Sequence, residues 1–303
     1  HPVHSDGDSR PVDVIARAES LGLNFLAIMD HNNVTHWVDQ SALGVQNVIL
    51  IPGYEVTTYH GHWNVWAPDT WVDFRVLSPA DMQQALDFAR EHAIVTSCNH
   101  PRPFGPEWEF TDVSSYHCVE VWNGHWHFDN HVALEFWESR LRQGQRLVAV
   151  GGSDMHRLNV ASDQVARLGT PTTWIHCPDE PTAAGLLAGL RAGHVFISAS
   201  PAGAQLYLSS GAALMGDSLT HPAADRLEIQ VRAVNAHDLD LLVIGAKGVL
   251  HIERVTTADQ TFTLTVSTAD TPYVRAQLVT PAASAGDLTV HALTNPLYLD
   301  DQP

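Results

Sequence analysis

Histidine and carboxylate residues follow several strand-like segments of this chain. In the clearest case an apolar run at 148–150 ends in two glycines, and Asp154 and His156 follow two residues apart. A carboxylate and an imidazole at the carboxyl end of one strand can both point into one cavity. Mixed sets of these ligands are typical of zinc, iron or manganese in hydrolytic sites. The plainer interpretation of this pair is an ordinary hydrogen bond at a strand end.

Three upstream segments show the same pattern. Each predicted strand leads to a ligand-type residue: His31 after 25–29, Glu55 after 48–52, and His100 after 93–98. Four such strand ends predict a metal centre at the mouth of a barrel. A carboxylate such as Glu55 can bridge two metals, whereas a neutral imidazole nitrogen binds only one. Two metals about 3.5–4 Å apart can hold a bridging hydroxide and the attacked oxygen together.

Helix and strand patterns alternate from residue 11 to residue 198. Pro11 opens a helix that stops at Gly22, and Ser78 caps another at 79–91. Repeated β–α units with short connections predict a parallel sheet closed into a barrel. The remaining predicted elements are helices at 35–46, 130–143 and 181–192, and strands at 62–66, 119–122, 147–151 and 173–176.

The pattern changes after Pro201 to period-two alternation with turns between the runs. These runs lie at 205–208, 227–232, 241–244, 262–266 and 273–278. Such alternation predicts a small all-β sandwich. We place the boundary near residue 198, which gives a catalytic domain at 1–198 and an accessory domain at 199–303. The accessory domain contains no cluster of ligand-type residues, so we expect it to support packing or a homo-oligomer.

Composition favours a globular enzyme that acts on a small molecule. The 303 residues carry a formal net charge of −18, from 34 acidic and 16 basic residues. Such a surface repels nucleic acid and anionic membranes, and no apolar run approaches the roughly 20 residues of a membrane span. The 19 histidines outnumber the lysines and arginines together, which favours metal binding. Three widely spaced cysteines form no disulfide framework, so the sequence does not indicate in which cellular compartment the protein acts.

Seven segments taken together resemble successive motifs of the polymerase-and-histidinol-phosphatase (PHP) superfamily. Within it they most resemble the carbaryl-hydrolase-like branch of metallohydrolases, and segments at 193–201, 216–217 and 293–297 resemble the β-domain appended there. The resemblance implies a distorted (β/α)7 barrel followed by a β-sandwich. The motif segments are 1–7, 29–32, 52–58, 61–64, 99–101, 120–123 and 152–156.

The resemblance also implies a site for two or three divalent transition metals, zinc, manganese or iron, with Glu55 as a bridge. It further implies a strand and a histidine immediately before His1, and we expect such upstream residues to complete the first ligand set. The implied sets are His1, Glu55 and Asp154 for the first metal; Asp6, His31 and His156 for the second; and Glu55, His62 and His100 for the third.

Several neighbouring residues have less direct roles. Asp30 suits a helix cap or a hydrogen-bond partner of a ligand better than a ligand. His60 competes with His62 for one position, and His62 lies in the better motif match. His4 and His127 are reserve candidates for a general acid.

The predicted activity is phosphoester hydrolysis by a metal-bridging hydroxide. Arg102 either grips an anionic substrate or is a solvated loop residue. Because it is the only obvious cation near a ligand, hydrolysis of a carbamate or an aryl carboxylic ester on the same metals remains the alternative. A second alternative is a non-catalytic module that binds metal or glycan. The predicted catalytic residues are Glu55, Asp154, His156 and Arg102.

Overall fold

The computed structural model describes residues 1–37, 47–92, 94–103, 105–159, 166–219, 226–269, 271–281 and 288–299. Helices and several β-sheets are both present, which confirms the predicted mixed α/β class. No helix among the described residues is both long enough and apolar enough to cross a membrane.

A five-stranded sheet in the order β3-β4-β5-β6-β7 forms the centre of the amino-terminal part. Strand β4 runs antiparallel to both β3 and β5, whereas β5, β6 and β7 are parallel to one another. The parallel pair β6–β7 needs a crossover connection, and a helix supplies it. The strands are β3 (Gly53–Thr58), β4 (Gly61–Trp66), β5 (Val95–Asn99), β6 (Cys118–Asn123) and β7 (Val148–Gly152).

Four described helices begin and end within two residues of the predicted positions. Pro occupies the first turn of α1 (Pro11–Ser20), and the Ser78 hydroxyl accepts a hydrogen bond from the backbone of Asp81 at the start of α3 (Pro79–Glu91). The crossover helix is α4 (Asn130–Arg142), and α5 (Ala183–Ala192) ends at Gly193 with a φ of 73°. The helix predicted at 35–46 falls largely outside the described residues.

Two short strands, β1 (Phe25–Ala27) and β2 (Ile49–Ile51), form a separate parallel sheet. The predicted strand at 48–52 therefore ends early. Glu55 lies inside the next strand, β3, rather than directly after β2. Strands β3 and β4 form a hairpin, because only residues 59 and 60 separate them.

The remaining strands form two further sheets. A seven-stranded sheet has the order β14-β13-β16-β17-β9-β8 with β18 paired to β16, and a four-stranded sheet has the order β11-β10-β12-β15. Their bounds are β8 (Thr172–Ile175), β9 (Val195–Ser198), β10 (Gln205–Ser210), β11 (Ala213–Leu214), β12 (Arg226–Val234), β13 (Asp240–Gly245), β14 (Gly248–Arg254), β15 (Asp259–Ser267), β16 (Tyr273–Val279), β17 (Val290–Thr294) and β18 (Leu297–Tyr298).

The described strands do not close into a barrel. Strands β8 and β9 pair antiparallel, and the other edge of β9 pairs with β17. The sheet therefore continues into the carboxyl-terminal strands instead of returning to β1. Because β9 ends at Ser198 and belongs to this sheet, hydrogen bonding is continuous across the boundary that we placed near residue 198.

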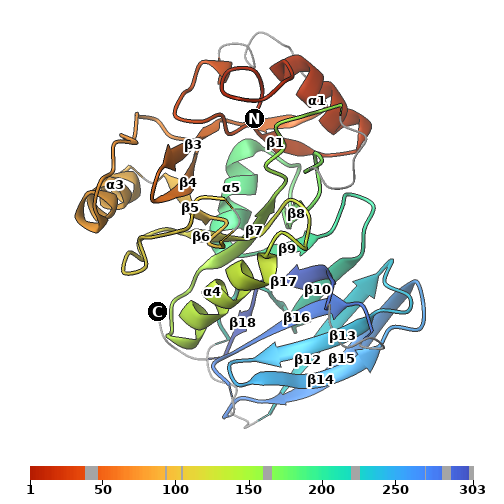
Figure 1. The fold of residues 1–303 in the computed structure, drawn as a ribbon. Helices are drawn as coiled ribbons and strands as arrows, with labels where there is room; N and C mark the ends of the chain where they lie inside the picture. Colours follow the sequence, from red (N-terminus) through yellow and green to blue (C-terminus); the bar gives the residue numbers. More distant parts are fainter. Residues whose placement is uncertain are drawn as a thin grey trace.

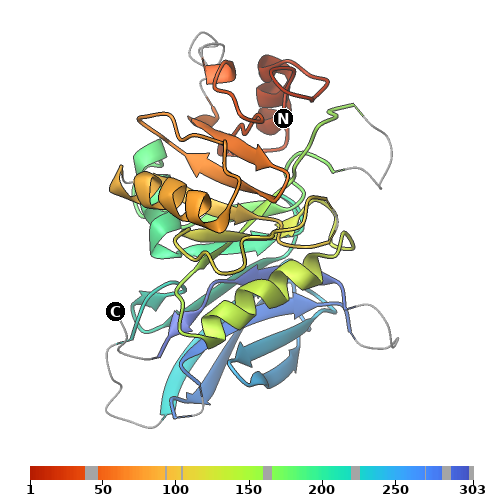
Figure 2. The same cartoon turned by 60° about the vertical axis from the view of Figure 1, so that its left-hand side comes forward.

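Helix α4 joins the two halves of the molecule. It lies between the β3–β7 sheet and the carboxyl-terminal strands in both views (Figures 1 and 2). The buried carboxylate of Glu138 on α4 forms an ion pair with Arg275 of β16 and accepts a hydrogen bond from the Tyr273 hydroxyl at 3.0 Å. The strands that carry the candidate metal ligands are thus supported by the carboxyl-terminal sheet.

Candidate metal centre

Side chains from the ends of separate strands meet at one place on the amino-terminal half. His31 follows β1 and forms an isolated parallel bridge with Glu55 of β3. His62 opens β4, His100 follows β5, and Asp154 and His156 follow β7, while His1 and Asp6 come from the amino-terminal segment. The structure brings all eight predicted metal ligands together. Seven of them divide into two groups with metal-binding spacing, one of His1, Asp6, His31 and His156, and one of Glu55, His62 and His100. Asp154 lies outside both groups, with Oδ1 3.0 Å from His1 Nε2.

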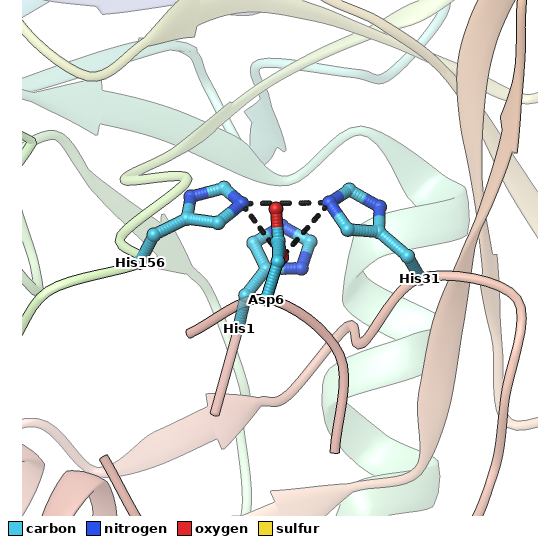
Figure 3. A group of neighbouring side chains, drawn as sticks. All are labelled: His1, Asp6, His31 and His156. Atoms are coloured by element: carbon cyan, nitrogen blue, oxygen red, sulfur yellow. Dashed lines mark hydrogen bonds and ion pairs between the residues drawn. The ribbon is translucent and has the colours of Figure 1, made fainter. Parts of the chain in front are cut away.

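The first group has ligand atoms at the separation that a metal requires. Figure 3 shows the rings of His31 and His156 pointing toward one another with Asp6 between them. Asp6 Oδ1 lies 3.4 Å from His31 Nε2 and 3.2 Å from His156 Nε2, and the two nitrogens are 3.4 Å apart. A tetrahedral metal with bonds of about 2.0–2.1 Å holds its ligand atoms about 3.4 Å apart. These residues therefore fit a transition metal.

Hydrogen bonds on the far side of both rings direct Nε2 toward this position. His156 Nδ1 lies 2.9 Å from the carbonyl oxygen of Asp154, which can only accept, so Nδ1 carries the proton. His31 Nδ1 lies 2.8 Å from Glu55 Oε2 and also contacts the hydroxyl of Thr57. A proton on Nδ1 leaves the Nε2 lone pair free for a metal.

His1 stands between the two groups. Its ring stacks on those of His31 and His156, with centroids 4.2 Å apart in each case. Its Nε2 lies 3.0 Å from Asp154 Oδ1 and 3.6 Å from Glu55 Oε2, the two residues with which the resemblance groups it. Its backbone nitrogen donates to the carbonyl of Met155 at 2.9 Å.

Glu55 lies between the two groups and presents one oxygen to each. Oε2 faces His31 and His1, whereas Oε1 lies 3.4 Å from His62 Nδ1 and 3.6 Å from His100 Nε2. Its side chain is only 3% exposed. A buried carboxylate that divides its oxygens between two ligand groups is suited to bridging two metals.

The pKa values reflect a buried charge cluster. Burial opposes the charge of Glu55, but His100, His31 and His62 hold its pKa well below the usual range. For His1 burial lowers the pKa, yet the bond to Asp154 and the charge of Glu55 outweigh it and raise the pKa to about 9. The pKa of His100 also rises to about 9, since Glu55 and Glu120 outweigh burial. Protons on these rings neutralise the carboxylates at sites that a divalent cation would occupy instead.

Two of the candidate ligands have strained backbones. His100 has a φ of 30° and Asp154 a φ of 49°, in the left-handed region that residues with a side chain seldom adopt. Each lies just beyond the end of a buried strand, β5 or β7. Such conformations cluster at functional sites, where the surrounding structure maintains them.

Arg102 bonds to the neighbouring loop. Its guanidinium, 3% exposed, donates to Asn123 Oδ1 at 2.5 Å, to the carbonyl of Phe128 and, at 3.4 Å, to Asn130 Oδ1. The prediction that Arg102 is a solvated loop residue is therefore wrong. These bonds attach residue 102 to the loop at 123–130, and its predicted contact with an anionic substrate stays a prediction.

The other residues that the sequence raised lie beside the centre. Asp30 is fully buried, accepts from the Ser5 hydroxyl at 2.5 Å and lies 3.2 Å from His36 Nδ1. This agrees with its predicted supporting role, because Ser5 holds the segment that carries Asp6. The reserve candidates form other contacts: His4 with Thr35, His127 with Thr289, and the competitor His60 with Glu109.

Sequence reasoning missed Asn99, which donates from Nδ2 to Glu55 Oε1 at 2.8 Å. The residue lies in the motif at 99–101, but only its neighbour His100 was singled out. Side-chain alternation could have identified Asn99 if the strand predicted at 93–98 is extended by one residue. Asn99 and Ser97 must share the face opposite to that of Cys98, and an amide there can meet the site.

A cavity of about 490 Å³ adjoins the centre. Its polar lining includes His1, Glu55, Asn99 and Asp154, and apolar side chains of β1, β8 and α5 line much of the rest. None of the described residues that line it is a lysine or an arginine.

No family model matches the sequence, and no curated protein matches it. Solved structures are similar to it. One is a two-domain protein from Bacteroides vulgatus described as containing a predicted PHP-like metal-dependent phosphoesterase, with 16% identity and a TM-score of 0.51 over 96% of this chain and 92% of that chain.

Two others match less of the structure. A protein from Bifidobacterium adolescentis described as a metal-dependent phosphoesterase has 16% identity and a TM-score of 0.33 over 52% of this chain and 85% of its own. An amidohydrolase from Chromobacterium violaceum with bound sulfate has 15% identity and a TM-score of 0.39 over 66% of this chain and 95% of its own. The likeness to the Bacteroides protein shows a shared fold.

Proposed function

We propose that this chain is a metal-dependent hydrolase of the PHP superfamily that cleaves phosphoesters of small molecules. The observation that carries the proposal is the triangle of Asp6 Oδ1, His31 Nε2 and His156 Nε2, whose edges of 3.2–3.4 Å match the ligand spacing of a bound transition metal. The fold shared with a two-domain PHP-like protein supports the superfamily and the phosphoester class.

The residues have distinct roles in this proposal. Asp6, His31 and His156 would hold one metal, and Glu55, His62 and His100 would hold another. Bound zinc, manganese or iron supplies a Lewis acid and lowers the pKa of a coordinated water. Asp154 accepts from His1 at 3.0 Å and so keeps that ring at the junction of both groups. Burial of Glu55 keeps water from screening its charge.

A second candidate is hydrolysis of a carbamate or an aryl carboxylic ester, as in the carbaryl-hydrolase-like branch. The cavity beside Glu55 and Asp154 favours it, because the lining is largely apolar and its described residues include no lysine or arginine. A neutral aryl group suits such a surface. A phosphoester would depend on the metals for neutralisation of its charge.

We also propose a barrel-type origin for the amino-terminal sheets and a β-sandwich for the carboxyl-terminal part. We interpret the sheets of the amino-terminal part as an opened form of the distorted (β/α)7 barrel, because His31, His100 and His156 follow β1, β5 and β7 in the expected order. The four-stranded and seven-stranded sheets share one hydrophobic cluster, which supports a β-sandwich in the carboxyl-terminal part.

Hydrolysis of matched chromogenic substrates tests the proposed function. The metal-loaded protein is assayed with aryl phosphomonoesters, phosphodiesters, carbamates and carboxylic esters that share one leaving group. We expect a phosphoester to be hydrolysed, the activity to vanish with chelator, and added metal to restore it. Carbamate or ester turnover alone would favour the second candidate. Tight metal binding without turnover of any substrate would indicate a binding module.

A further inference from the structure

A neutral side chain, Asn99, contacts the carboxylate between the two ligand groups. Asn99 Nδ2 donates to Glu55 Oε1 at 2.8 Å, and Oε1 is the oxygen that faces His62 and His100. Asn99 is 3% exposed and Glu55 is 2% exposed, so the bond is shielded from water. Hydrogen bonds to an ionised acceptor are stronger than those between neutral groups.

The orientation of this amide is fixed by Ser97. The fully buried Ser97 hydroxyl donates to Asn99 Oδ1 at 2.8 Å. Both residues lie on β5, two positions apart, and therefore on the same face of the strand. A reversed amide would place its oxygen against the carboxylate of Glu55 and lose both bonds. Ser97 thus keeps the donor side of Asn99 toward Glu55.

Backbone pairing sets the geometry of this contact. In the register of β4 and β5, Asn99 lies opposite His62, and Ser97 lies opposite Asn64. In the register of β3 and β4, Asn64 lies opposite Glu55. Asn99 and Glu55 therefore approach each other across the intervening strand β4, and neither depends on a loop for its position.

We propose that Asn99 is a positioning residue for the metal centre. With Ser97 it fixes the plane of the Glu55 carboxylate, so that Oε1 stays directed at His62 and His100 while Oε2 stays directed at His1 and His31. A free glutamate would have to lose side-chain rotamers when metal binds. The fixed carboxylate avoids much of that loss. This inference rests on the proposed metal centre, but not on the reaction catalysed there.

Titration with Co²⁺ tests this role without an activity assay. The affinity is measured by competition with a chelator, and the visible absorption reports the coordination. Loss of a partner that orients a ligand typically lowers metal affinity by about 10- to 100-fold, and we expect this for Asn99→Ala together with a changed spectrum. Ser97→Ala removes one neutral hydrogen bond and should lower the affinity by about 2- to 10-fold.

Asn64→Ala is the matched control. Asn64 lines the same cavity, and its amide oxygen has no hydrogen-bond partner among the described residues. It should keep the wild-type affinity and spectrum. Equal binding by Asn99→Ala and Asn64→Ala would overturn the positioning role alone, whereas a wild-type protein that binds no Co²⁺ would overturn the metal centre as well. If Asn99→Ala does not fold, the Co²⁺ affinity of Ser97→Ala tests the positioning role instead. A wild-type Co²⁺ affinity of Ser97→Ala would then contradict the inference.

Discussion

At the scale of single residues, Glu55 is the residue on which the proposed metal centre depends most. Its two oxygens serve different histidines, at 2.8 Å from His31 Nδ1 and at 3.4 Å from His62 Nδ1. The sequence singled out this carboxylate but placed it after a strand at 48–52, whereas it lies inside β3. It could not predict the division of the oxygens, which depends on the pairing of β3 with β4 and on the amide of Asn99.

Replacement of Glu55 by Gln tests the bridge. The amide keeps the shape but removes the negative charge between two cations, which then repel each other. We expect metal-dependent hydrolysis to fall by roughly 10²- to 10⁴-fold, on whichever substrate is used, with an unchanged circular dichroism spectrum. Turnover near that of the wild type on a chelator-sensitive substrate would contradict the bridging role.

The histidine pKa values predict how metal stabilisation depends on pH. Those of His1 and His100 rise from 6.5 to about 9, so their protons stabilise the metal-free fold below pH 6.5, and this stabilisation is lost as the pH rises through about 9. Metal competes with these protons. The Tm difference between metal-loaded and metal-free protein should therefore increase from pH 6.5 to pH 9. A difference that decreases over this range would contradict the assignment.

At the scale of elements, the end of β7 and the start of α3 were predictable, whereas sheet closure was not. The glycines that end β7 and the Pro and Ser that begin α3 are local signals, and the structure agrees with them. Closure depends on which strand lies beside β9. Its partner β17 follows β9 in the sequence by more than 90 residues. No local pattern specifies such a pairing.

The start of α3 provides a test at this scale. Ser78 Oγ accepts from the backbone nitrogen of Asp81 at 3.2 Å and donates to the Asp81 carboxylate at 2.8 Å. Ser78→Ala should lower the free energy of unfolding by about 1 kcal/mol, as loss of a helix cap usually does. Metal affinity should not change, because α3 contributes no candidate ligand. Denaturant unfolding and a Co²⁺ titration measure the two effects.

At the scale of the whole molecule, a buried ion pair connects the site-bearing half to the carboxyl-terminal sheet. Glu138 of α4 and Arg275 of β16 have side chains 8% and 3% exposed. The boundary near residue 198 stays a prediction, and this ion pair crosses it. A pair 137 positions apart in the sequence gives no signal in hydrophobic periodicity.

Breaking this pair should destabilise the protein strongly. Glu138→Ala leaves the guanidinium of Arg275 buried without its counter-charge, and we expect the free energy of unfolding to fall by about 3–5 kcal/mol. The double variant Glu138→Ala with Arg275→Met should recover part of the loss. Asp259→Ala is the control, because Asp259 pairs with Arg232 at the surface and its loss should lower the free energy of unfolding far less. An equal decrease in the free energy of unfolding for Glu138→Ala and Asp259→Ala would show that the position of α4 does not depend on this ion pair.

The metal content of the purified protein tests the central claim most directly. His31 and His156 supply two of the three ligand atoms that lie 3.2–3.4 Å apart, and the exposed His237 serves as the control. Mass spectrometry should find at least one equivalent of transition metal in the wild type and in His237→Ala. The double variant His31→Ala with His156→Ala should retain about a tenth or less, since loss of two direct ligands exceeds the 10- to 100-fold effect of a supporting residue. Full metal retention in the double variant would contradict a metal centre at these strand ends.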